Sequence, residues 1–271
     1  MPISNKLQNL AEEFLNDWRQ WRAPFHAQPK IVAPLEGGLT NTSYLIASDS
    51  QRAVLRINNP KANKLGVNRH NEITILKRLQ STDLVPKLYF ADSRYLVSEY
   101  INGIVLDDDK ASDPGIKKQI EQAIAVFQKQ DCTAMAVRNY QAYLRHYCNQ
   151  ISPRYLDKTT RQSLLQLASD IDAQDWQPVL CHHDLIPENI ILSAQGLKII
   201  DWEYASVGHP QFDYLRLTNS HQIMAIPVNR CGLQALQATL SHLWYAIHYP
   251  ELRETVQHKL SKIIETVQAS S

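Results

Sequence analysis

The sequence predicts an α+β fold in which a small antiparallel sheet comes first and a larger, mainly helical part follows. Short apolar runs within residues 31–46 and 52–57, with a glycine pair inside the first, are typical of strands joined by hairpins. From residue 114 onward, apolar side chains recur at three- and four-residue steps, as amphipathic helices require. With 271 residues, 44% of them hydrophobic, the chain can bury the core of one bilobal domain or of two small ones.

Each element follows from its local pattern, taken in chain order. Helical spacing of apolar residues predicts an amphipathic helix over residues 4–20, which we interpret as packing. Three antiparallel strands are expected within 31–57, with Gly37 and Gly38 at the turn between the first two. The other predicted elements are a helix over 69–80, strands over 85–90 and 94–101, helices over 114–130, 138–150 and 156–172, a hairpin over 189–200, and helices over 229–248 and 250–267.

Charge and cysteine content narrow the class of partner. A formal net charge of +1 gives no overall attraction to nucleic acid or to an anionic membrane, so we expect a small-molecule substrate and neither of those partners. The sequence does not indicate an oligomeric state. The cysteines show no Cys-x-x-Cys spacing and are expected to be reduced thiols. No leader-like or membrane-spanning apolar run occurs, which favours a cytoplasmic location.

Four polar residues with a particular spacing lie among short strand-like runs: His182, Asp184, Asn189 and Asp201. Phosphoryl transfer to an alcohol needs a carboxylate for the hydroxyl proton, and an amide oxygen and a second carboxylate for magnesium. The hairpin predicted over 189–200 would return Asp201 to the side of Asn189. The spacing therefore predicts a phosphoryl-transfer site with Asp184 as the catalytic carboxylate and with Asn189 and Asp201 as the metal ligands.

This segment resembles the phosphotransferase superfamily of aminoglycoside phosphotransferases, choline and ethanolamine kinases, and bacterial thiamine kinases. The run Ile-Asp-Trp-Glu-Tyr-Ala at 200–205 is most similar to the choline and thiamine kinase branches, and His183 replaces the arginine of the protein-kinase motif. The resemblance implies a bilobal protein-kinase-like fold. It implies a nucleotide-binding lobe over 1–102 that ends in a hinge, and a catalytic and substrate-binding lobe over 103–271. ATP and Mg²⁺ are the implied cofactors.

The resemblance assigns the nucleotide contacts to the first lobe. Arg56 lies where kinases carry a phosphate-binding lysine, and Glu72 on the next helix would pair with it. Without such a role, Arg56 would be an exposed cation on a strand, and Glu72 would be an acid in the first turn of a helix, where the helix dipole favours it. The glycine pair and the donors after it suit phosphate oxygens, although alone they are an ordinary hairpin. The predicted nucleotide contacts are Gly38, Thr40, Asn41, Thr42, Ser43, Arg56, Glu72, Glu99 and Ile101.

The acceptor is expected to be a cationic alcohol of the choline, ethanolamine or thiamine type. Glu203 is the candidate to face its positive charge, and Trp244 and Tyr245 could contribute cation–π contacts, although aromatic residues at helical spacing commonly belong to a core. The resemblance gives His182 and Asp213 supporting roles around the catalytic loop, and Asp213 could equally cap a helix.

Three other functions are left open. An aminoglycoside-type phosphotransferase would use the same catalytic residues. A catalytically inactive nucleotide-binding protein would be expected to lack some of them, whereas Asp184, Asn189 and Asp201 are all present. A hydrolytic metal site at His182, His183 and Asp184 would need two adjacent histidines to reach one ion, and adjacent side chains on an extended segment point to opposite faces.

Overall fold

The computed structural model describes residues 5–36, 40–217 and 228–269 and divides the chain into two compact units. The first unit contains residues 1–130 and 186–205, and the second contains 131–185 and 206–271. The predicted lobe boundary near residue 102 does not coincide with the boundary between these units, and it stays a prediction. Within the described ranges, no helix has both the length and the hydropathy that crossing a membrane requires.

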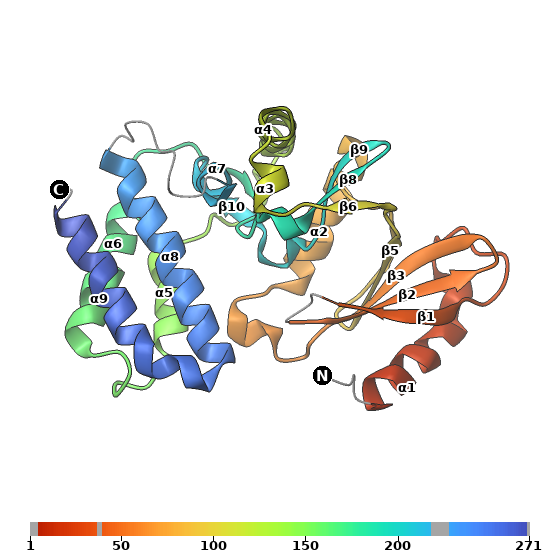
Figure 1. The fold of residues 1–271 in the computed structure, drawn as a ribbon, viewed down its shortest axis with the longest axis horizontal. Coiled ribbons are helices and arrows are strands. Elements are labelled where there is room, and N and C mark those ends of the chain that lie inside the picture. Colours follow the sequence, from red (N-terminus) through yellow and green to blue (C-terminus); the bar gives the residue numbers. More distant parts are fainter. Residues whose placement is uncertain (1–4, 37–39, 218–227, 270–271) are drawn as a thin grey trace. The chain divides into compact units, whose positions relative to one another are not determined.

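A five-stranded antiparallel sheet forms the start of the first unit (Figure 1). Its order is β1-β2-β3-β5-β4, and the predicted strands are confirmed; the turn at Gly37 and Gly38 lies outside the described residues. The strands are β1 Lys30–Leu35, β2 Thr42–Ser48, β3 Gln51–Ile57, β4 Leu88–Ala91 and β5 Tyr95–Glu99. Alternation along β2 and β3 buries Tyr44, Ile46 and Leu55 on one face.

The predicted N-terminal helix covers that buried face. Helix α1 Asn5–Phe14 continues into the short 3₁₀ helix Leu15–Gln20. Its Phe14 ring stacks on Tyr95 of β5 at 3.9 Å between ring centroids. Helix α2 Arg69–Leu79 follows the third strand, and the Asn68 side chain caps its start by accepting from the Asn71 amide. The ring contact joins α1 to the sheet, and the cap fixes the start of α2.

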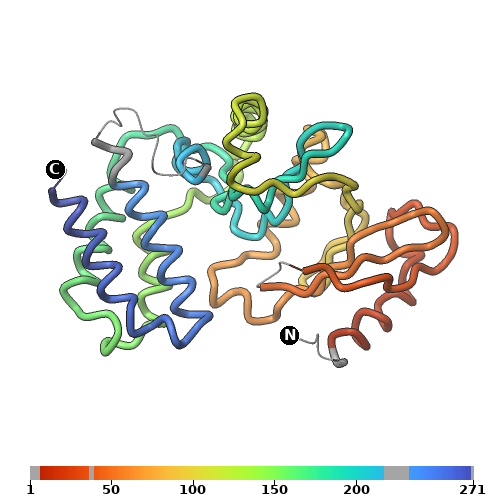
Figure 2. The backbone as a smooth tube through the Cα atoms, viewed as in Figure 1, coloured from red at the N-terminus to blue at the C-terminus, as the bar shows by residue number. Residues whose placement is uncertain are grey.

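The remainder of the first unit is a small sheet built from distant segments, and Figure 2 shows its strands side by side. Strand β6 Gly103–Val105 pairs with β8 Ile190–Ser193, which pairs in turn with β9 Gly196–Ile199. Between β6 and β8 in sequence, the chain forms α3 Asp108–Ala111 and α4 Pro114–Gln128. The Phe127 ring of α4 meets Trp202 edge-on at 5.3 Å, so this helix helps to hold the segment around Asp201.

The second unit is mainly helical, as predicted. Its four long helices pack together around a common core (Figure 1). Each helix contributes a buried leucine to that core: Leu144, Leu164, Leu236 and Leu260. They are α5 Tyr140–Cys148, α6 Lys158–Asp172, α8 Val228–His248 and α9 Arg253–Ala269. A two-stranded ladder of β7 Val179–Cys181 and β10 Ser206–Gly208, followed by α7 Phe212–Leu217, completes the unit.

Candidate functional site

The β8–β9 hairpin brings Asn189 and Asp201 together, as the sequence predicted. A two-residue turn joins Ser193 to Gly196, whose φ of 105° favours glycine. At the open end of the hairpin, the Ile200 amide donates to the Asn189 carbonyl at 2.9 Å. Asn189 ends a short 3₁₀ turn, and Asp201 lies two residues after the end of β9, so the ladder fixes both backbones near each other.

The donor set of this pair fits a magnesium ion. Asn189 supplies an amide oxygen and Asp201 a carboxylate, the hard oxygen donors that Mg²⁺ prefers. The Asp201 side chain is 37% exposed, and its backbone adopts a left-handed φ of 62°. That conformation costs energy in a non-glycine residue and is common at functional sites. The two residues could therefore hold a divalent cation.

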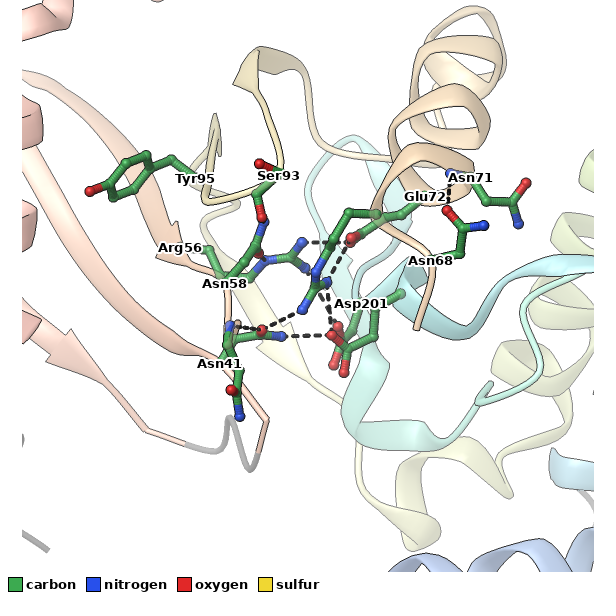
Figure 3. A network of polar contacts seen from close by, with 12 residues as sticks. Asn41, Arg56, Asn58, Asn68, Asn71, Glu72, Ser93, Tyr95 and Asp201 are labelled. Atoms are coloured by element: carbon green, nitrogen blue, oxygen red, sulfur yellow. Dashed lines mark hydrogen bonds and ion pairs between the residues drawn. The ribbon is translucent and has the colours of Figure 1, made fainter. Parts of the chain in front are cut away.

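Arg56 lies in the same unit and contacts the predicted partner, Glu72. Its Nη2 atom donates to Glu72 Oε1 at 2.6 Å, and its Nε donates to Asn58 Oδ1 at 2.9 Å (Figure 3). Its Nη1 lies 3.7 Å from Asp201 Oδ1. The guanidinium is therefore held between the acid of helix α2 and the carboxylate that follows β9, and its alternative interpretation as an exposed strand cation is wrong.

Sequence reasoning missed Arg69, which joins the two buried acids of this network. Its Nη1 lies 2.8 Å from Glu72 Oε2 and 2.9 Å from Glu203 Oε2. Its Nη2 donates to Asn41 Oδ1 at 2.7 Å, while Asn41 Nδ2 donates to Glu203 Oε2 at 2.8 Å. Arg69 opens α2, three residues before Glu72, and this helical i, i+3 spacing was the one available signal.

Burial and charge act in opposite directions on these groups. Burial disfavours the charged form of Arg56, but Glu72, Asp201 and Glu203 outweigh it and raise the pKa of the guanidinium above its ordinary value. Burial would likewise raise the pKa of Glu72, and the charges of Arg56 and Arg69 reverse this and lower it. Arg56 and Glu72 are therefore both charged at neutral pH.

The predicted phosphate-binding loop is described from Thr40 onward, and Gly38 lies outside the described residues. Thr42 and Ser43 belong to strand β2, where Ser43 pairs directly with Arg56 of β3. The Asn41 side chain is used by the network, since its Oδ1 also accepts from the Asn59 amide at 3.2 Å. Phosphate contacts by these residues stay predictions. Among them, Ser43 has the best support, because it is the cross-strand neighbour of Arg56.

The predicted adenine-binding segment follows strand β5. Glu99 is the last residue of that strand, and its amide donates to the Lys87 carbonyl at 2.9 Å. Its Oε2 accepts from the Lys87 amide at 3.2 Å. Ile101, two residues later, is half-buried. Both groups of Glu99 therefore serve the sheet, and adenine recognition here stays a prediction.

In the second unit, Asp213 holds the loop that precedes Asp184 by its backbone. Its two carboxylate oxygens accept from the amides of His182 at 2.8 Å and His183 at 2.9 Å. Burial raises the pKa of Asp213 to about 7, although both amides act in the opposite direction. Asp213 is the second residue of α7 and bonds to a distant loop, so the supporting role is confirmed and the helix-cap alternative is wrong.

His183 has a left-handed φ of 65° and a buried ring. That ring lies 3.2 Å from the Tyr140 hydroxyl and 3.3 Å from the Ser206 hydroxyl. A methyl group on Gly208 would lie 2.7 Å from His183 Nε2, so glycine is required for this close approach. Nδ1 of His182 accepts from the Asp184 amide at 3.3 Å. Both histidines thus serve the shape of the loop.

Asp184 lies on this loop and contacts an arginine that sequence reasoning missed. Arg216, in the last turn of α7, donates from Nη2 to Asp184 Oδ1 at 3.1 Å and from Nη1 to Ser241 Oγ at 3.0 Å. The side chains of Arg216 and Asp184 are 28% and 27% exposed, so the pair is open to solvent in part. No local sequence pattern predicts this contact, because the two residues are 32 positions apart.

The predicted acceptor residues are divided between the units. Glu203, in the first unit, is buried at 3% exposure and paired with Arg69, so facing a substrate stays a prediction that this geometry does not favour. Trp244 and Tyr245 lie on α8 in the second unit. Trp244 packs against the helical core and stacks on His248 at 3.7 Å, whereas Tyr245 is 46% exposed.

Comparison with solved structures shows the fold, and a family model shows the family. Choline kinase LicA from Streptococcus pneumoniae matches with a TM-score of 0.71 at 21% identity, covering 97% of this chain and 100% of that one. A second structure of LicA, in complex with AMP, matches with a TM-score of 0.72. These likenesses confirm the predicted α+β, protein-kinase-like fold. A model of the phosphotransferase enzyme family matches residues 31–254, and the chain belongs to that family.

Curated relatives point to small-molecule kinases. Ethanolamine kinase 2 of Homo sapiens is 25% identical over 193 residues, which cover 65% of this chain and 49% of that protein. Thiamine kinase of Salmonella gallinarum is 27% identical over 183 residues, which cover 67% of this chain and 62% of that protein. The chain thus spans about half the length of the first relative and under two thirds of the second.

Proposed function

We propose that this chain transfers a phosphoryl group from ATP to the hydroxyl of a small cationic alcohol of the choline, ethanolamine or thiamine type. The observation that carries the proposal is the Arg56 guanidinium, held 2.6 Å from Glu72 and 3.7 Å from Asp201. In kinases, a cation fixed by the acid of the following helix positions the nucleotide phosphates. Family membership and the retained Asp184 support the same proposal.

In this mechanism each residue has one task. Arg56, oriented by Glu72 and Asn58, positions the nucleotide phosphates, with Ser43 on the neighbouring strand as a further donor. Asp184 orients the acceptor hydroxyl and takes its proton as the bond to phosphorus forms. Asn189 and Asp201 would hold magnesium, which when bound neutralises charge on the phosphates. Arg69 is a positioning residue, because it acts through Glu72.

Two parts of the earlier expectation continue as proposals. Residues 1–102 are proposed as the nucleotide-binding lobe and 103–271 as the catalytic and substrate-binding lobe. The cationic class of the acceptor rests on the names of the relatives, an ethanolamine kinase and a thiamine kinase. Tyr245, with its exposed ring, is the better placed of the two aromatic candidates for a cation–π contact.

The test is a screen for ATP consumption with magnesium across choline, ethanolamine, thiamine and an aminoglycoside. We expect one alcohol to be consumed and Asp184→Asn to lower kcat by about 10² to 10⁴-fold with ATP affinity unchanged, since only proton transfer is lost. Asp175→Asn, an exposed aspartate of the same unit, is the matched control. Near-full activity of Asp184→Asn would exclude it as the base.

A further inference from the structure

The guanidinium of Arg216 occupies the surroundings of the proposed base. It bonds Asp184 with one nitrogen at 3.1 Å and Ser241 of α8 with another at 3.0 Å. With 28% and 27% of the two side chains exposed, solvent screens this charge only in part. A hydroxyl that approaches Asp184 must therefore do so next to a fixed positive charge.

Ser241 also lines a pocket in the second unit, and this pocket has a basic character. The pocket, of ≈ 330 Å³, is lined by Ser241, His242, Tyr245, Leu252, Val256 and Lys259. These lining residues include a lysine and no carboxylate. Burial, together with the charge of Lys259, lowers the pKa of His242, as expected beside a cation. The Arg216 guanidinium therefore links this pocket to Asp184, because it donates both to Ser241 in the pocket lining and to the Asp184 carboxylate.

We infer that Arg216 is a specificity-determining residue that disfavours alcohols whose positive charge lies next to the hydroxyl. The inference rests on the proposed function, because it takes Asp184 as the group that receives the hydroxyl proton. In choline or ethanolamine, two carbons separate the nitrogen from the hydroxyl, so its charge would lie close to the guanidinium. The Asp184 carboxylate attracts the same charge. At the intermediate dielectric of a half-buried site, Arg216 offsets that attraction, which lowers the affinity for such an alcohol by about tenfold or more relative to a site without the guanidinium.

The proposed acceptors are narrowed accordingly. An alcohol that carries its charge several atoms from the hydroxyl, or spread over a ring, meets less repulsion from Arg216. Such a molecule could lie along Tyr245 and the apolar residues Leu252 and Val256 while its hydroxyl reaches Asp184. Arg216 would thus separate two kinds of cationic alcohol that the carboxylate alone cannot distinguish.

The experiment measures binding by calorimetry, which requires no turnover. Choline and its uncharged analogue, with carbon in place of nitrogen, are titrated into the wild type, Arg216→Gln and Arg216→Lys. We expect Arg216→Gln to raise the ratio of choline affinity to analogue affinity about tenfold or more above that of the wild type, and Arg216→Lys to keep the wild-type ratio. Arg154→Gln, which removes an exposed arginine of the same unit, is the control and should behave as the wild type.

Several results would overturn the inference. They are equal ratios of choline affinity to analogue affinity in all three proteins, a lower ratio in Arg216→Gln than in the wild type, or no binding of either alcohol. Ser241→Ala, which leaves the charge in place, should retain the wild-type preference, and its loss there would also count against a charge effect. The proposed function fails separately, when no alcohol in the ATP screen accepts a phosphoryl group.

Discussion

Replacing Arg69 by methionine is expected to destabilise the first unit by about 3 to 5 kcal/mol, the usual cost of removing one partner of a buried ion pair. Arg69 faces two carboxylates whose side chains are each only 1% exposed. Glu72 keeps Arg56 after the substitution, at 2.6 Å. Glu203 keeps the neutral amide of Asn41, so the uncompensated charge falls mainly on Glu203.

The two compact units can unfold separately, so the measurement should resolve them. Hydrogen exchange read by peptide should show faster opening of residues 42–99 in Arg69→Met and unchanged exchange in α8 and α9. Lys77→Met, which removes an exposed cation from the same helix, is the control. Adding Glu203→Leu to Arg69→Met should recover part of the loss, because the stranded charge is then removed.

A loss of less than about 1 kcal/mol in Arg69→Met would refute this reasoning, since that is the value of an exposed ion pair. It would mean that the loss of Arg69 leaves no uncompensated buried charge on Glu203. For a larger loss, the double variant distinguishes a charge effect from lost packing. Recovery of stability requires that the charge on Glu203 was the cause, whereas simple addition of two losses would place the cause in lost packing.

Three other predictions concern pH, packing and thiol reactivity. The pKa of Glu72 lies below its ordinary value of 4.5, so the stability that ionised Glu72 gives the first unit is complete above that pH and is lost as the pH falls. Chemical denaturation from pH 6 to 3 should therefore show a falling unfolding midpoint for the first unit, and an unchanged midpoint would contradict this prediction. Gly208→Ala should lower the free energy of unfolding by about 1 to 3 kcal/mol in thermal unfolding, because the added Cβ would lie 2.6 Å from the Tyr140 hydroxyl. Gly232→Ala, whose added Cβ would have its nearest contact at 3.5 Å, should lose no stability. Burial raises the pKa of the Cys148 thiol to about 11, so iodoacetamide at pH 8 should modify half-buried Cys132 first, and equal rates would disprove the burial argument.

The pairing of Arg56 with Glu72 was predicted from the family resemblance, which local pattern supported by placing both residues on regular elements. One lies on a strand with clear hydrophobic character and the other in the first turn of the next helix, 16 residues later. The hairpin that joins Asn189 to Asp201 was equally accessible, since its two strands and turn are contiguous. Motif spacing is reliable where one short segment determines the geometry.

The contacts of Arg69, Glu203 and Arg216 were not accessible in this way. Asn41 and Glu203 meet across 162 residues, and hydrophobic periodicity carries no information about such distant partners. Glu203 was expected to face a substrate because its acid group lies next to the motif, yet tertiary packing gives it a buried arginine. Strand β6 was missed for a related reason, since its three residues are all exposed and show no alternation.

The first unit cannot be cut out of the chain as one continuous piece. A fragment ending at Gln130 would carry β6 with no strand to receive its hydrogen bonds, and the Phe127 ring would lose Trp202. Engineering that exchanges the first unit between relatives must therefore move residues 186–205 with it. Because that insert begins two positions after Asp184, the junction of each transplant would lie next to the proposed base.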